Sequence, residues 1–441
     1  MTEAASPVSS GERVETLDVV RGFALLGILI MNIVGMGLPM AAYFNPAALG
    51  PPSESDLRTW FVVNTFFEGS MRTLFSMLFG AGFILLLDRF DARGLGMMGA
   101  KIYARRIMLL MLMGLIDIVV FLWSGDILLV YGVTALFLLP FWKSKLRGLI
   151  VWAAILLVFQ TIFAIGGGVK FGEMEGAYRE AIAVRDAGQT LTEEQSGTIR
   201  TWEETTEFFQ ATPKSIEESM QRAAGGWPAV AGYNFGELFT MELGFFMLTG
   251  VLDALFAMIL GMIAYRIGLL HGRWRTQHVV MLTAIGFGLG IPLNWFETQS
   301  IVNSGYTIHG FFSMMSTYQI GRVLLAMGWI GLVLLACKAP WMRWFRIAIG
   351  AVGRMALSNY LAHSIIAAIF FIGFGFYGDL SRTELYYVVA AMWAFNIVFS
   401  LAWLSAFQMG PAEWLWRAGT YGSWPQLKKI GGSRLAPAPA E

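Results

Sequence analysis

The sequence predicts an all-α membrane protein that crosses the bilayer about ten times. Hydrophobic residues make up 56% of the 441 residues, charged residues make up 14%, and the mean hydropathy is +0.60. The apolar residues gather in runs of about 20, the length that an α-helix needs to span a bilayer. A chain with this pattern is not a soluble globular domain. We therefore expect a polytopic helical protein.

The charge balance and the motif content exclude several other classes. The formal net charge is +1, which gives no argument for nucleic acid as a partner. The single cysteine excludes an intramolecular disulfide and a cysteine-rich metal site. HExxH, GxSxG and P-loop motifs are absent from the sequence, which disfavours metal-dependent hydrolysis, serine hydrolysis and nucleotide-driven transport. No metal is expected.

The first apolar run, residues 17–38, carries polar residues near both ends. Asp18 and Arg21 share one helical face at its start, and Asn32 follows Gly22 by ten residues. A structural anchor needs neither Asp18 nor Asn32, so we expect this helix to line a site. In the alternative interpretation, Arg21 reaches the lipid headgroups and Asn32 caps or cross-links helices.

The second segment, residues 60–87, is interrupted by polar residues that include Glu68, Gly69 and Arg72. This pattern predicts a short interfacial helix followed by a span over residues 74–87. Glu68 and Arg72 are four residues apart, so they can satisfy one another on a helix face. A role for Glu68 in a site is the other interpretation.

The remaining apolar runs predict eight further helices, over residues 107–123, 127–142, 149–165, 238–267, 279–295, 311–336, 351–376 and 386–407. Gly166, Gly167 and Gly168 are interpreted as the end of the fifth helix. The polar stretch that follows predicts an insert of short amphipathic helices. The predicted organisation is an N-terminal segment (1–16), five spans (17–168), an acidic insert (169–236), five spans with a terminal region (237–430), and a disordered tail (431–441).

Lysine and arginine gather in every second connection, which predicts an orientation. The basic connections follow the second, fourth, sixth, eighth and tenth spans, and basic residues in them include Arg89, Arg106, Lys143, Arg266, Arg346 and Arg417. Basic connections remain in the cytoplasm. We therefore expect both termini to be cytoplasmic and the acidic insert to lie outside.

Charged and amide side chains inside the spans form a candidate polar core. A charge at the bilayer centre costs between about 3 and more than about 10 kcal/mol, so such groups pair with one another or face a hydrated cavity. Asp253 can pair with Arg322 across two helices. The candidate polar core comprises Arg72, Asp117, Glu242, Asp253 and Asn359.

Asp126 and His363 each have two interpretations. Asp126 stands at a predicted helix start, where it acts as an N-cap or as a site residue. His363 lies one helical turn after Asn359, on the same face, where an imidazole can handle protons. A hydrogen-bonded packing role is the other interpretation of His363.

Several stretches occur in a characteristic order: LDVVRGFALLGILIMN, GLPMAAYFNP, MRTLFSMLFGAGF, GDILLVYG, FAMILGMIAYRIGLL, GRMALSNYLAHSIIAAIFFIGFGFYG and GPAEWLWRAGTYG. In these stretches the chain resembles the YeiB-like bacterial membrane family (domain of unknown function 418). The resemblance spans nearly the whole chain outside the acidic insert. It implies a multi-pass protein of the bacterial cytoplasmic (inner) membrane.

The first helix also resembles that of the transmembrane acyltransferase superfamily, which includes the type-3 acyltransferases and the lysosomal heparan-alpha-glucosaminide N-acetyltransferase. In that transferase an Arg-Gly pair and an asparagine recur at the interval of Arg21, Gly22 and Asn32. The superfamily moves an acyl group from a cytoplasmic coenzyme A thioester to an acceptor on the far side. The resemblance therefore implies acyl-CoA (acetyl-CoA) as co-substrate and a small molecule, a glycan or a membrane lipid as partner.

The resemblance also implies roles for particular residues. Asn32 would donate a hydrogen bond to the thioester carbonyl oxygen, and arginines would hold the phosphates of the coenzyme. The histidine that follows the asparagine in the transferase is missing here, so the base is sought elsewhere, and His363 stands where YeiB-like proteins commonly show glutamine. The candidate catalytic residues are Asn32, Glu68, Asp126, His309 and His363, and the candidate cofactor-binding residues are Asp18, Arg21, Gly22, Arg322 and Arg354.

Two other functions use the same features. A transporter or channel for a small solute or lipid-like molecule would need the same buried polar groups and closely packed glycine-rich helices. A lipid-binding scaffold would use the acidic insert as its partner surface. The sequence leaves the oligomeric state open, a homodimer included.

Overall fold

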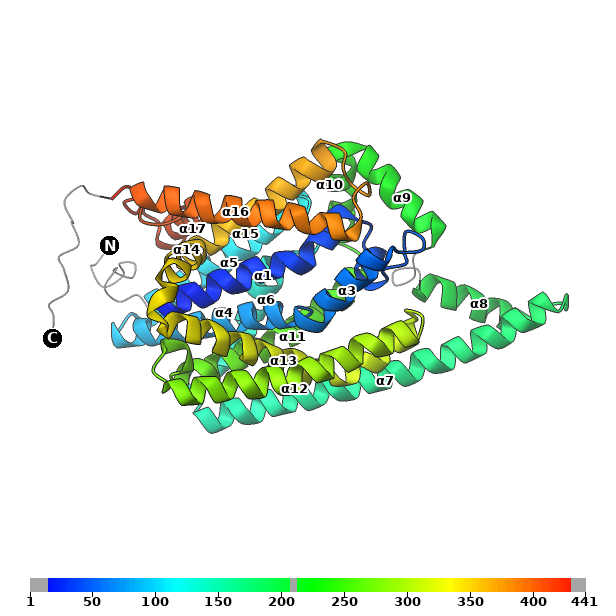
Figure 1. The fold of residues 1–441 in the computed structure, drawn as a ribbon, viewed down its shortest axis with the longest axis horizontal. Coiled ribbons are helices and arrows are strands. Elements are labelled where there is room, and N and C mark those ends of the chain that lie inside the picture. Colours follow the sequence, from blue (N-terminus) through cyan, green and yellow to red (C-terminus); the bar gives the residue numbers. More distant parts are fainter. Residues whose placement is uncertain (1–14, 207–211, 430–441) are drawn as a thin grey trace.

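The computed structural model describes residues 15–206 and 212–429, which form an elongated bundle of helices (Figure 1). Within these residues the β-type pairing is limited to an isolated bridge between Phe407 and Lys428. The all-α prediction is confirmed. The predicted disordered tail and most of the N-terminal segment lie outside the described residues.

Eight segments of the described chain are long and apolar enough to cross a membrane. They comprise α1 (Glu15–Gly37), α3 with α4 (Glu54–Phe66 and Ser70–Ala92), α7 (Leu146–Asp186), α11 (Met241–Arg266), α12 (Thr276–Asn303), α13 (Ile308–Lys338), α15 with its π-turn (Ala356–Ala367 and Ala368–Gly373) and α16 (Arg382–Ala406). Two more apolar helices, α5 (Gly96–Val119) and α6 (Leu128–Leu138), lie where the sequence predicts spans. The protein is thus a helical membrane protein.

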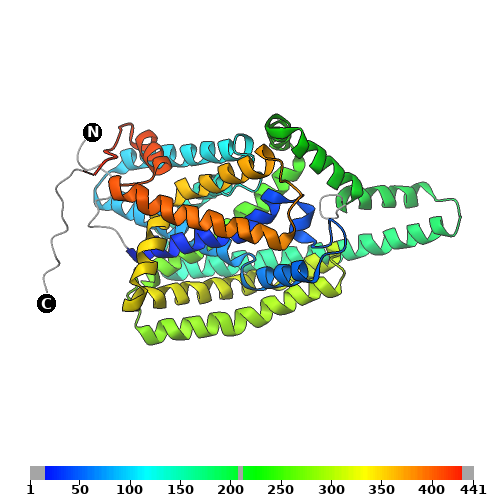
Figure 2. The same cartoon turned by 45° about the horizontal axis from the view of Figure 1, so that its top comes forward.

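Helix α1 runs through the middle of the bundle, between α4 and the pair α14 (Arg343–Arg354) and α16 (Figures 1 and 2). Its backbone touches that of α14. A Cβ atom added at Gly22 would lie 2.0 Å from the carbonyl oxygen of Ile349, and one added at Gly353 would lie 1.8 Å from that of Asp18. Helices approach this closely only where both carry glycine. The close packing of α1 on α14 therefore requires Gly22, the glycine of the Arg-Gly pair in the sequence.

The interruption predicted at Glu68 and Gly69 is confirmed. Helix α3 ends at Phe66, α4 begins at Ser70, and Gly69 between them has φ +65°. This left-handed conformation favours glycine. The chain therefore turns inside the candidate membrane-crossing segment Glu54–Ala92, and Glu68 lies in the turn and not on a continuous helix face.

The single helix predicted over residues 351–376 is wrong, because the chain breaks at Met355 between α14 and α15. The backbone N–H groups of Leu357 and Ser358 donate to Glu413 at 2.7 and 3.2 Å. Glu413 belongs to α17 (Pro411–Tyr421). It caps α15 from another part of the chain, which stabilises a helix start that local periodicity does not show.

The helix end predicted at Gly166–Gly168 is also wrong, since α7 continues to Asp186. A Cβ atom at Gly167 would lie 3.1 Å from the ring of Phe312 on α13, and Phe171 stacks on the same ring with centroids 4.5 Å apart. Packing against α13 outweighs the poor helix propensity of glycine.

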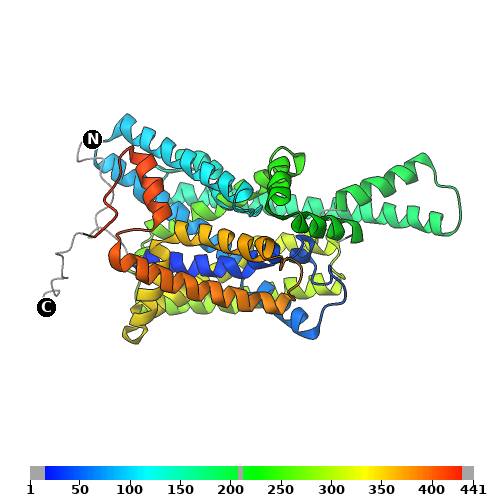
Figure 3. The same cartoon turned by 90° about the horizontal axis from the view of Figure 1, so that it is seen from above.

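The outer part of α7 extends beyond the bundle and pairs with α8 (Glu193–Thr206), as Figure 3 shows. Tyr178 of α7 stacks on Trp202 of α8, with ring centroids 5.5 Å apart. Helices α9 (Pro213–Ala224) and α10 (Gly226–Glu237) follow. The insert therefore contains short helices, as predicted, but its first part is a continuation of a membrane-crossing helix.

The basic connections meet at one end of the bundle, which we call the basic end. Arg266 at the end of α11 donates to the carbonyl oxygen of Trp142, which follows α6, at 2.7 Å. Lys338 at the end of α13 donates to the carbonyl oxygen of Gly272 at 3.2 Å, and Gly272 packs against Thr16 at the start of α1. The alternation of basic and basic-poor connections in the sequence thus corresponds to two ends of the fold.

Candidate functional site

A cavity of about 1010 Å³ lies inside the bundle, toward the end opposite the basic end. Most of its wall is apolar and includes Met31, Phe67 and Phe163. Five of the predicted polar residues also lie on the wall, namely Asn32, Glu68, Arg72, Asp126 and Asp253. An apolar cavity with a few convergent polar groups is the usual form of a small-molecule site.

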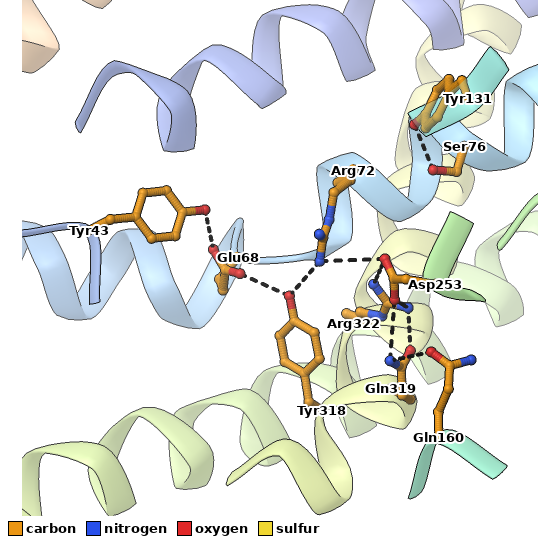
Figure 4. Close-up of polar contacts among 10 residues, drawn as sticks. All are labelled: Tyr43, Glu68, Arg72, Ser76, Tyr131, Gln160, Asp253, Tyr318, Gln319 and Arg322. Atoms are coloured by element: carbon orange, nitrogen blue, oxygen red, sulfur yellow. Dashed lines mark hydrogen bonds and ion pairs between the residues drawn. The ribbon is translucent and has the colours of Figure 1, made fainter. Parts of the chain in front are cut away.

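Glu68 accepts two hydrogen bonds from tyrosines across this cavity (Figure 4). The hydroxyl of Tyr43 donates to it at 3.1 Å and the hydroxyl of Tyr318 at 2.8 Å. The Tyr318 hydroxyl in turn accepts from Arg72 at 3.1 Å. The predicted direct pairing of Glu68 with Arg72 is therefore wrong. The break at Gly69 separates the two side chains, and Tyr318 lies between them.

The predicted ion pair between Asp253 and Arg322 is confirmed. One guanidinium nitrogen of Arg322 donates to Asp253 at 2.9 Å and the other contacts its second oxygen, so the pair is bidentate. Arg72 also approaches Asp253, at 3.6 Å. The side chain of Arg322 is 0% exposed, whereas that of Arg72 is 43% exposed and lines the cavity. Arg72 is therefore the guanidinium within reach of a ligand.

Two glutamines extend this network to α7 (Figure 4). The amide of Gln319 donates to Asp253 at 3.2 Å and to Gln160 at 2.9 Å. Sequence reasoning missed Gln160, Tyr43 and Tyr318 as members of the site. Gln160 carried a usable signal, because it is a polar residue in a long apolar run.

Asn32 differs from its charged neighbours because its side-chain amide makes no hydrogen bond to any residue in the described part of the chain. It lies on the cavity wall and is half-buried. An amide at membrane depth normally finds a partner in the protein or in a hydrated site. The amide of Asn32 is therefore available to a ligand.

Asp126 also lines the cavity, but the protein already holds both of its oxygens. One accepts from the backbone N–H of Leu129 at 2.7 Å, which is the predicted capping role, and the other accepts from the hydroxyl of Tyr360 at 3.0 Å. Asp117 is buried nearby and accepts from Ser364 at 3.2 Å. These aspartates connect α5 and α6 to α15.

His363 and Asn359 are buried on α15, outside the cavity wall as the described residues define it. The ring of His363 contacts the amide of Asn396 on α16. The amide of Asn359 donates to Ser400 at 2.8 Å. This placement agrees with the packing interpretation of His363.

The cofactor-binding candidates are divided between two places. Arg322 belongs to the polar network that joins Glu68, Tyr318, Arg72 and Asp253, which we call the central network. Asp18, Arg21 and Arg354 lie at the basic end. Arg21 pairs with Asp18 at 3.1 Å and keeps 31% of its side chain exposed, and Arg354 donates to the carbonyl oxygen of Gln408 at 3.2 Å. Arg21 precedes Asn32 by eleven residues, about 16 Å along the helix axis.

The side chains of two candidates, Glu242 and His309, lie outside the described part of the structure. Their proposed roles stay predictions. No group of three or more His, Cys, Asp or Glu side chains among the described residues is arranged to hold a metal ion.

Known proteins with similar sequences cover nearly the whole chain. It is 31% identical over 427 residues to "Uncharacterized protein YeiB" of Escherichia coli (strain K12), across 92% of this chain and 96% of that protein. It is 27% identical over 431 residues to "Uncharacterized protein YxaH" of Bacillus subtilis (strain 168), across 96% of this chain and 98% of that protein. No solved structure matches the chain.

The C-terminal part of the bundle also matches a described family. Residues 264–423, from the end of α11 to the end of α17, match "Protein of unknown function (DUF418)". Together with the full-length similarity to the Escherichia coli protein, this match shows that the chain belongs to the YeiB-like DUF418 family.

Proposed function

We propose that the protein is an integral membrane acyltransferase. It would move an acyl group, in the first instance acetyl, from a cytoplasmic coenzyme A thioester to an acceptor at or beyond the outer face of the bacterial cytoplasmic membrane. The observation that carries the proposal is the unpartnered amide of Asn32 on the wall of a cavity that also holds Glu68 and Arg72.

The proposed orientation places the basic end in the cytoplasm, because basic connections are retained there. Ten spans then follow from the eight long segments together with α5 and α6. Both termini are cytoplasmic, and the α7–α8 hairpin with α9 and α10 lies outside. The cavity with Asn32 opens toward the outer half of the membrane, where an acceptor arrives.

In the proposed reaction Asn32 donates a hydrogen bond to the thioester carbonyl oxygen as negative charge develops on it. The acceptor hydroxyl or amine attacks the carbonyl carbon, Glu68 takes the acceptor proton, and the coenzyme leaves as its thiolate. We assign the base to Glu68 and not to Asp126, because Asp126 is 6% exposed and caps a helix start, whereas Glu68 is only partly buried on the cavity wall. Arg72, exposed to the cavity, suits an anionic part of the acceptor.

The basic end supplies groups that fit the phosphates of the coenzyme. Arg106 of α5 lies close enough to Arg21 and to Arg417 of α17 for its charge to interact with each of theirs. Guanidinium groups bind phosphate in a bidentate manner. Ile28 is the α1 residue of the cavity wall nearest to the basic end. Delivery of the thioester to Asn32 therefore requires a separation of α1 from its neighbours.

The test is turnover of acetyl-CoA by the purified protein in lipid nanodiscs, with Asn32→Ala as the variant and Asn303→Ala as the matched control. Asn303 is exposed at the end of α12 and is not part of the cavity wall. Loss of an oxyanion donor lowers the rate about 10²- to 10³-fold. We expect this loss in Asn32→Ala and none in the control. Equal turnover by wild type and Asn32→Ala would contradict the proposal.

A transporter for a small solute or lipid-like molecule is the second candidate. The observation that favours it is the helix break at Gly69, which places charged groups of a discontinuous helix beside a cavity within the membrane. Solute flux into proteoliposomes without any turnover of acyl-CoA would support this function over the first.

A further inference from the structure

A second buried polar cluster lies between α12 and α13, apart from the central network. It consists of Asn294 and Glu297 on α12 and Thr317 on α13. Asn294 is 4% exposed and Glu297 is 5% exposed. None of the three residues belongs to the wall of the described cavity. The central network and the acyl-transfer proposal therefore do not account for them.

Oxygen atoms of this cluster converge on one point beside Gly321 of α13. The hydroxyl of Thr317 donates to Oε1 of Glu297 at 2.6 Å. A Cβ atom added at Gly321 would lie 2.2 Å from Oδ1 of Asn294 and 3.3 Å from Oε1 of Glu297. The amide oxygen and the carboxylate oxygen thus approach the same position, and only a glycine leaves room for both.

The cluster lacks a positive charge. Oδ1 of Asn294 is buried without a hydrogen-bond partner. The groups that face the cluster are neutral: Thr317 from α13, Thr298 from α12, and Thr65 from α3, whose hydroxyl donates to Thr298 at 3.5 Å. Throughout the described chain, no basic side chain forms an ion pair with Glu297. A carboxylate buried inside the bundle needs compensation, and two acceptor oxygens cannot satisfy each other.

We propose that Asn294, Glu297 and Thr317 bind one monovalent cation, either a proton or Na⁺, within the membrane. A protonated Glu297 would donate a hydrogen bond to Oδ1 of Asn294, which would give both groups a hydrogen-bond partner. A sodium ion would occupy the same position, since a set of oxygen ligands without nitrogen or sulfur suits a hard cation. Thr317 and Gly321 directly precede Tyr318 and Arg322, so one helix carries both this site and the central network.

The test is the thermal unfolding of the purified protein in detergent, at constant ionic strength, in NaCl, KCl or choline chloride, and across pH 5 to 8 in choline chloride. The variant is Glu297→Gln, which keeps the shape of the neutral side chain. The matched control is Glu54→Gln, because the Glu54 side chain is 80% exposed. If Na⁺ is the ligand, NaCl raises the wild-type Tm by about 2 °C or more over choline chloride, and Glu297→Gln loses this response.

If a proton is the ligand, NaCl has no specific effect, and the wild-type Tm falls with rising pH while that of Glu297→Gln does not. Identical salt and pH responses in wild type and Glu297→Gln would overturn the proposal. That result would mean that Glu297 is ionised and held by the Asn294 amide in its other orientation. Should Glu297→Gln not fold, Thr317→Val removes one oxygen ligand, and an unweakened cation or pH response in it would overturn the proposal as well.

Discussion

The break at Gly69 lies inside a candidate membrane-crossing segment and the break at Met355 lies directly before one, and the unpaired groups at the two breaks find different partners. At Met355, Glu413 of α17 accepts the backbone N–H groups that the new helix leaves unpaired. At Gly69 the neighbouring side chains face a cavity, and the partners of Glu68 and Arg72 are other side chains on its wall. A break in a membrane helix therefore indicates a site when the side chains beside it face a cavity. It does not do so when another part of the protein accepts the unpaired backbone N–H groups.

The largest effect is expected from Asp253→Ala, which removes the carboxylate behind the Gly69 break. Arg322 would remain fully buried without its counter-charge, and the loss of one partner of a buried pair costs about 3 to 5 kcal/mol. We expect a sharply lower yield of folded protein and a lower Tm, measured by size-exclusion chromatography and thermal unfolding. The double variant Asp253→Leu, Arg322→Met should recover much of this loss. A double variant no better than the single one would show that the pair is not the cause.

An intermediate effect is expected from Glu413→Ala, which removes the side chain that caps α15 after the break at Met355. Two backbone N–H groups and the hydroxyl of Ser358 lose their acceptor, at a cost of about 2 to 3 kcal/mol. The expected result is a lower Tm with unchanged turnover per folded molecule, since Glu413 lies away from the cavity wall. The Tm of Glu413→Gln, which keeps one oxygen, should fall between those of wild type and Glu413→Ala. Lost turnover at an unchanged Tm would show that this break is also a functional site.

The smallest effect on stability is expected from Tyr43→Phe, which removes one of the two hydrogen bonds to Glu68 at the Gly69 break. One such bond contributes about 1 kcal/mol. We expect a change in turnover of severalfold with little change in Tm, because the lost hydrogen bond is made to the proposed base, Glu68. Tyr387→Phe is the control, since Tyr387 is 74% exposed on α16. Equal turnover in wild type and Tyr43→Phe would count against Glu68 as the base.

The helices and one ion pair could be predicted from the sequence because both follow from local or general physics. A run of about 20 apolar residues forms a helix in a membrane whatever its neighbours are. An unpaired charge in the membrane has a high free-energy cost, so the pairing of Asp253 with Arg322 could be expected from the sequence. Asn32 could be predicted as a site residue for a similar reason, because a helix that only anchors the protein in the membrane does not need a side-chain amide.

The rest of the site depends on contacts between distant parts of the chain. Tyr43 and Tyr318 are amphipathic aromatic residues of a kind found in most membrane helices, and only the fold brings both to Glu68. The Met355 break depends on Glu413, which lies 56 residues after Leu357. The pairing expected between Glu68 and Arg72 assumed an unbroken helix, and Gly69 removes that condition.

The long helix α7 has a mechanical consequence. Its 41 residues span about 62 Å, twice the thickness of the hydrocarbon core, so α7 is longer than one bilayer crossing requires, and its second half extends beyond the bundle. Glycine costs about 1 kcal/mol relative to alanine in a helix, so the run Gly166–Gly168 is the softest place on this helix. Phe312 supports that place on one side. We therefore expect a load on the part of α7 beyond the bundle to bend the helix at these glycines before it displaces Gln160 of the central network.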